Sequence, residues 1–182
     1  YDQAITLYRK LSQDHPNDPL DVEARFRLGE CQLAKGQLKE ARRSWQDLSA
    51  KHGEGKSKRV AEAAFQLSRT WQIPKPPRDE DLHSGVAALE LFAKQFPDHK
   101  LASVARFDVA QAYMHRDRHE DAVEAVKRFL ADPRYADSEE TPNARNLLGR
   151  AYQLQKKFDK ALTAWKEYLA KHPADKAWSE VL

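Results

Sequence analysis

The chain has 182 residues, of which 41% are hydrophobic and 32% are charged, and its formal net charge is only +3. This composition is typical of exposed amphipathic helices rather than of a disordered chain. Because 31 basic residues nearly balance 28 acidic ones, nothing in the charge demands nucleic acid or an anionic membrane as a partner. No run of 18 apolar residues is present, so we expect no membrane span.

A small residue followed by two bulky residues at helical spacing recurs five times along the chain. The bulky residues stand four and seven positions after the small one, on one face of a helix. In chain order the sets are Ala4/Tyr8/Leu11, Ala41/Trp45/Leu48, Gly85/Leu89/Phe92, Ala122/Val126/Phe129 and Ala161/Trp165/Tyr168. A second helical pattern lies between them, with alanine at 24, 63, 105 and 144. Such a period predicts an all-α fold, a solenoid of antiparallel helix pairs.

The same periodicity predicts the order of the elements within a single solenoid, 1–182. We expect a half repeat at 1–16, helix pairs at 19–53, 58–97, 101–134 and 140–173, and the start of another repeat at 174–182. Polar turns at 35–37, 116–118 and 155–157 are short enough to force antiparallel hairpins. Pro16, Pro97 and Pro173 are placed to end second helices. We interpret the chain as a piece of a longer protein and predict that any self-association runs through its ends.

Several of these residues resemble the tetratricopeptide repeat. The run Leu148-Gly149-x-x-Tyr152, followed by Ala161-x-x-x-Trp165-x-x-Tyr168 and Pro173, fills nearly every signature position of that family. The copy near Ala61 departs from it by carrying extra residues before Gly85. The resemblance implies a right-handed superhelix that binds proteins. Linkers such as Phe96-Pro97-Asp98 resemble the bacterial subset that includes BamD and YbgF, which implies a bacterial, periplasmic adaptor.

In that family the first helix of each pair lines a concave groove, and this implies a set of partner-binding positions. Carried over, they are Glu23, Phe26, Glu30, Glu62, Phe65, Arg69, Phe107, Gln111, Met114, Asn146 and Arg150. The three phenylalanines occupy one equivalent position, where they either fill the core or form an apolar stripe for a peptide. The charge along the groove changes from negative at the glutamates to positive at Arg69 and Arg150. The groove would therefore orient a peptide whose own charge changes in the opposite direction.

The sequence therefore predicts a non-catalytic scaffold that binds a protein or peptide. The alternative is a structural spacer within a larger envelope protein, with no groove ligand. RNA binding is disfavoured by the acidic first half of the groove. We expect no enzyme activity, because no nucleophile and base or paired carboxylates stand out.

Four smaller motifs have simple structural interpretations. Residues 50–57 fit a loose phosphate-loop pattern, but they follow a helix, so Ser57 is expected to cap the next helix. His115 and His119 straddle a turn, which favours a solvated turn over a zinc site. Cys31 falls among small packed positions and is expected to be buried and inert. The insertion 73–81 is either a tolerated surface loop or a segment presented to a partner. We predict no cofactor and no metal.

Overall fold

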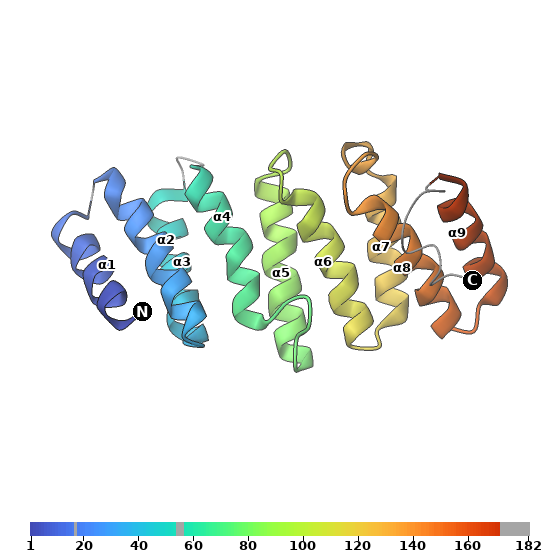
Figure 1. Ribbon diagram of the computed structural model, residues 1–182, viewed down its shortest axis with the longest axis horizontal. Coiled ribbons are helices and arrows are strands. Elements are labelled where there is room, and N and C mark those ends of the chain that lie inside the picture. Colours follow the sequence, from blue (N-terminus) through green and yellow to red (C-terminus); the bar gives the residue numbers. More distant parts are fainter. Residues whose placement is uncertain (17, 54–56, 172–182) are drawn as a thin grey trace. The chain divides into compact units, whose positions relative to one another are not determined.

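The computed structural model describes residues 1–16, 18–53 and 57–171, which form nine α-helices and no strand (Figure 1). Helix α1 (Asp2–Asp14) precedes four helix pairs. These are α2 (Pro19–Ala34) with α3 (Leu38–His52), α4 (Lys58–Leu67) with α5 (Asp79–Gln95), α6 (Ala102–His115) with α7 (His119–Ala131), and α8 (Thr141–Leu154) with α9 (Phe158–Lys171). Short 3-10 helices, η2 (Ser68–Trp71) and η3 (Pro133–Tyr135), follow α4 and α7. The predicted all-α fold is confirmed, while the predicted segment 174–182 lies outside the described residues.

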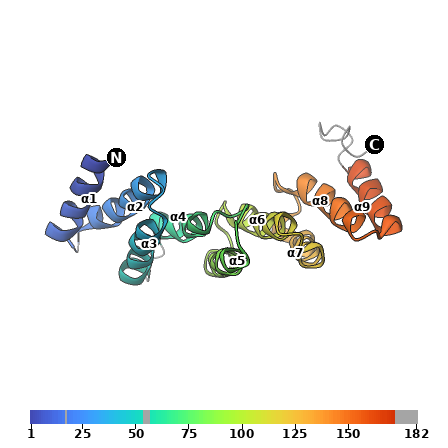
Figure 2. The same ribbon diagram turned by 90° about the horizontal axis from the view of Figure 1, so that it is seen from below.

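The helices form two compact units, and the chain passes between them three times, once within α5. The first unit comprises 1–73 and 83–99, and the second comprises 74–82 and the chain from 100 onward. In the first unit α2 contacts both α3 and α4, and in the second α6 contacts both α7 and α8. Figure 2 shows α2 and α4 in one layer and α3 in another. The first helices of consecutive pairs are therefore neighbours within each unit.

The repeated bulky residues of the second helices form the core. Trp45 and Leu48 of α3, and Val126 of α7, have no exposed surface. Tyr8 and Leu11 of α1 and Trp165 of α9 are the exceptions, because they are only half-buried. A single short helix is marginal in water, so this packing between helices supplies most of the stability.

Two tryptophans lie directly against glycines of the preceding helix. A Cβ added to Gly29 would collide with the indole of Trp45, and one added to Gly149 would collide with that of Trp165. The equivalent positions in the other pairs are Ser68 and Ala110, where the second helix carries a smaller residue instead of tryptophan. In both pairs whose second helix carries a tryptophan, the first helix therefore has glycine at the position that contacts the indole.

The turns inside the pairs share a left-handed residue. Backbone φ is +73° at Gly36, +56° at Asp117 and +59° at Lys156, each at the centre of a predicted turn. Gln72 has the same conformation, with φ of +59°, at the end of η2. One such residue ends the first helix and reverses the chain, which confirms the predicted hairpins. Only one of the four is glycine, so the other three carry backbone strain.

Candidate functional site

The three phenylalanines of the predicted groove are core residues. Phe26, Phe65 and Phe107 are 3%, 4% and 9% exposed, respectively. Phe65 meets Phe92 edge-on with ring centroids 5.5 Å apart, and Phe107 lies 6.5 Å from Phe129. Of the two interpretations left open by the sequence, core packing is the one that these contacts support. The phenylalanines do not form an exposed apolar stripe.

Arginines cover these rings in the first unit. The guanidinium carbon of Arg59 lies 4.8 Å from the ring centroid of Phe26, and that of Arg27 lies 5.9 Å from it. Arg69 stands 5.1 Å from the centroid of Phe65 and donates to the carbonyl oxygen of Ile73 at 2.5 Å. Guanidinium groups rather than apolar side chains therefore cover Phe26 and Phe65.

The same arginines join the three glutamates of the predicted groove into one network. Glu23 accepts hydrogen bonds from Arg27 at 2.7 Å and from Arg59 at 2.5 and 3.0 Å. Arg27 also donates to Glu30 at 2.8 Å, and Arg59 donates to Glu62 at 2.6 Å. Burial raises the pKa of Glu23, but the hydrogen bonds from the two arginines outweigh it and leave that pKa below its ordinary value.

This network changes the predicted charge of the face. Two guanidinium groups largely neutralise the three carboxylates, so the first unit does not present an acidic half groove. The sequence interpretation missed Arg27 and Arg59. The spacing of Arg27, four residues after Glu23 and three before Glu30, is a signal that could have identified it.

In the second unit, two predicted groove residues line a small cavity. Gln111 and Met114 of α6 face Leu147 of α8 across about 190 Å³. Arg150, one helical turn beyond Leu147, is exposed. Asn146 is turned inward, because its Oδ1 accepts a hydrogen bond from the Trp165 indole at 3.3 Å. The cavity is completed by Pro74, Lys75 and His115.

The insertion forms one wall of that cavity and is anchored to α6. Arg116 donates to Asp79 at 3.0 Å and to the carbonyl oxygen of Pro77 at 3.3 Å. Between Lys75 and Pro77, Pro76 is fully buried. The insertion is therefore part of the folded second unit.

A buried carboxylate ties the two ends of the first helix pair together. Asp21 of α2 has no exposed side-chain surface and pairs with Arg25 at 2.8 Å, Lys51 at 3.0 Å and His52 at 2.9 Å. Burial alone would raise the pKa of Asp21, but hydrogen bonds from Arg25, His52 and Lys51 outweigh it and lower that pKa to about 2. His52 thus has a specific partner on the neighbouring helix.

The minor sequence motifs have structural roles in the described ranges. The hydroxyl of Ser57 accepts a hydrogen bond from the backbone N–H of Val60 at 3.3 Å, which confirms the predicted cap, while residues 54–56 lie outside those ranges. Cys31 is half-buried rather than buried. Among residues 1–16, 18–53 and 57–171, no three His, Cys, Asp or Glu side chains gather as a metal site would need. No helix in these ranges has the length and apolar character for a membrane crossing.

The helix pairs, glycine contacts and turns define a helical-repeat solenoid, and comparison with known proteins identifies the repeat. Residues 1–64 and 147–175 match profiles of the tetratricopeptide repeat. These matches, together with the fold, support a tetratricopeptide-repeat protein. The resemblance of the linkers to BamD and YbgF stays a prediction.

Similar solved structures are also solenoids of this kind. MamA protein is 20% identical with a TM-score of 0.64, covering 94% of this chain and 82% of its own. A putative kinesin light chain with TPR-like repeats from Podosopora anserina is 16% identical (TM-score 0.66; 96% and 89% covered). A thermophilic TPR protein of Thermus thermophilus, TTC0263, is 21% identical (TM-score 0.54; 99% and 87% covered). At these identities the likeness shows the fold alone. No curated protein matches the sequence significantly.

Proposed function

We propose that this chain is a non-catalytic protein–protein interaction scaffold that holds a peptide or partner protein on the surfaces that its first helices form within each unit. The observation that carries the proposal is the cavity where Gln111 and Met114 of α6 meet Leu147 of α8. At about 190 Å³ it is smaller than the ~300–1,000 Å³ typical of small-molecule pockets. It suits one apolar side chain of a bound segment, with Arg150 nearby to contact an acidic neighbour.

On the first unit, the proposed contacts of the first helices are polar. The carboxylates of Glu23, Glu30 and Glu62 are already paired with arginines, so a partner exchanges ion pairs there rather than adding new ones. Exposed ion pairs contribute little to affinity, and we infer that this part of the face acts mainly on specificity. Arg69 supplies positive charge for a partner on the first unit, and Arg150 supplies it on the second.

A specific observation favours the alternative, a structural spacer of a bacterial envelope protein. Phe26, Phe65 and Phe107 are buried, so they give neither unit the apolar stripe that a long peptide ligand would use. In this alternative the repeats fix distances, and the linker pattern at Phe96-Pro97-Asp98 reflects an envelope location.

The two functions are separated by a crosslinking experiment followed by calorimetry. A photoreactive residue at position 111 captures the partner in extract of the source cells, and the purified partner is then titrated with each variant. Met114→Glu places a charge in the cavity and is expected to weaken binding at least about tenfold. Leu162→Glu is the matched control, because Leu162 is 53% exposed on α9 and lies outside the cavity. Equal affinity of the wild type and Met114→Glu for the partner would refute this site, and failure to capture any partner would favour the spacer.

A further inference from the structure

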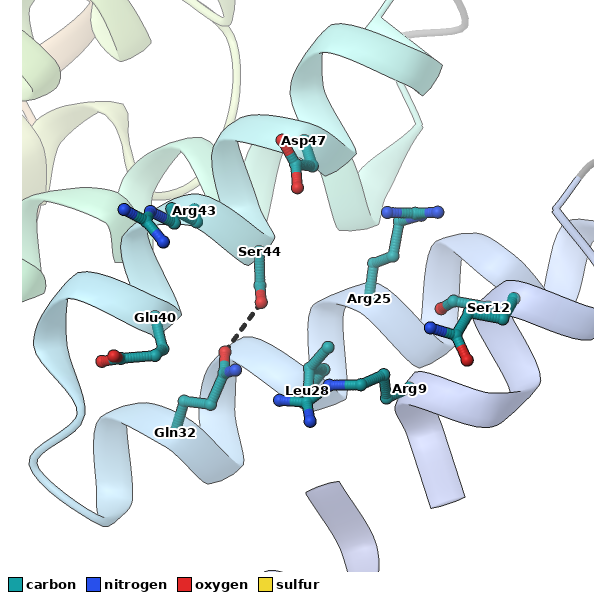
Figure 3. Close-up of a pocket in the computed structure, with 10 residues that line it drawn as sticks. Arg9, Ser12, Arg25, Leu28, Gln32, Glu40, Arg43, Ser44 and Asp47 are labelled. Atoms are coloured by element: carbon teal, nitrogen blue, oxygen red, sulfur yellow. Dashed lines mark hydrogen bonds between the residues drawn. The ribbon is translucent and has the colours of Figure 1, made fainter. Parts of the chain in front are cut away.

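A polar cleft of about 320 Å³ opens between α1, α2 and α3 in the first unit (Figure 3). Its floor consists of Arg25, Leu28 and Gln32, which share one face of α2. At 100° per residue, Glu23 and Glu30 lie on the opposite face of that helix. The cleft is therefore a different surface from the one proposed above, and no residue of the second unit lines it.

Two neighbouring helices supply only basic charge to this cleft. Arg9 comes from α1, and Figure 3 shows its side chain extending across the floor beside Leu28. Arg25 comes from α2, where its Nε is fixed by the Asp21 carboxylate at 2.8 Å. Within the described residues, no hydrogen bond or ion pair holds the guanidinium group of Arg9. Arg9 can therefore donate to a carboxylate of a bound segment.

A buried amide completes the donor set. Gln32 is only 3% exposed, and its Oε1 accepts a hydrogen bond from the Ser44 hydroxyl at 2.7 Å. This bond fixes the orientation of the amide, so its NH₂ group is the part that faces the cleft (Figure 3). A fixed donor on a buried floor orients a ligand better than surface side chains alone, because it loses little freedom when the ligand binds.

The opposite wall carries acidic residues, and these restrict the ligand. Glu40 and Asp47 of α3 line the cleft on either side of Arg43. A polyanion would meet repulsion from both carboxylates, whereas a basic group beside a single carboxylate would be attracted to them. We propose that the cleft binds a peptide segment of mixed charge, with one carboxylate on Arg9 and the Gln32 amide and an adjacent basic side chain towards Glu40 and Asp47.

The proposal is tested by NMR titration of the ¹⁵N-labelled chain with the dipeptide acetyl-Glu-Lys-amide, which detects weak binding. The expected result is a saturable shift of the Gln32 side-chain NH₂ and Arg9 Nε–H signals. Arg9→Gln should reduce the initial slope of that titration about tenfold, since it removes a charged donor. Lys10→Gln is the control, because it makes the same charge change one residue away, outside the cleft, and should leave the titration unchanged.

Three results would overturn the inference. The first is the absence of any shift at Gln32 and Arg9, and the second is an equal titration of Arg9→Gln and the wild type. The third is equal or tighter binding of inorganic phosphate or acetyl-Glu-Glu-amide, which would indicate a general anion site. Met114 belongs to the other unit, so the Met114→Glu variant should bind the dipeptide as the wild type does. This proposal and the scaffold proposal can therefore fail independently of each other.

Discussion

The charge of Asp21 should be worth roughly 2 kcal/mol to the folding of the first helix pair. Its pKa falls from an ordinary value of 3.8 to about 2, and one pKa unit corresponds to about 1.4 kcal/mol, which gives this figure. The carboxylate has no exposed surface, which limits the solvent screening of its ion pairs. We therefore expect Asp21→Asn to lose roughly 2 kcal/mol of unfolding free energy at pH 7.

The pH dependence separates this charge effect from lost packing. A depressed pKa means that the unfolded chain binds the proton more readily, so the stabilisation is complete above about pH 4. It is then lost as the pH falls from about 4 to about 2. The difference between the wild type and Asp21→Asn should shrink across this window.

The assay is urea unfolding followed by far-UV circular dichroism at several pH values, with Asp14→Asn as the control. Asp14 is an exposed carboxylate near the end of α1, so its replacement should change stability little. If Asp21→Asn lost as much stability at pH 2.5 as at pH 7, the loss would arise from packing and the reasoning would be refuted.

Three further predictions concern the backbone. Each is measured as the urea midpoint of unfolding of the variant named. Lys156→Gly should stabilise the chain by up to about 1 kcal/mol, because glycine removes the strain of a φ of +59°, and no gain would contradict the strain. Gly36→Ala should destabilise by roughly 1 kcal/mol, since φ is +73° there, and an unchanged midpoint would argue against a left-handed turn. Gly29→Ala should cost roughly 1–3 kcal/mol by forcing a methyl group against Trp45, whereas Gly53→Ala, with open space around it, should be near neutral.

Most of the fold could be predicted from the sequence because helical spacing decides which side chains are buried. The small and bulky residues at 41, 45 and 48 are all fully buried, as their offsets of four and seven require. The turns were also predictable, because short polar segments between helical patterns leave room only for a hairpin. The conformation of Asp117 and Lys156 was not, since a left-handed residue is ordinarily marked by glycine and these two positions lack it.

The candidate sites were harder to predict, because they depend on contacts between different repeats. The position of Phe26 on the first helix marks it as a groove residue by resemblance, but Arg59 of α4 covers its ring and also binds Glu23 of α2. The periodicity of a single repeat carries no information about such a pairing. The cleft beside α2 likewise requires Arg9, Gln32 and Ser44 from three helices, and no pattern within one helix brings them together.

This difference indicates where function can vary in a solenoid of this kind. Core positions must keep their spacing, because each pair buries its apolar face against the next, and a change there costs stability. The residues that couple α2 to α1 and α4 are polar and partly exposed, so they can change at little cost to the core. Binding specificity should therefore reside in residues such as Arg9, Arg59 and Met114, which differ among equivalent positions, rather than in the residues that make the chain repeat.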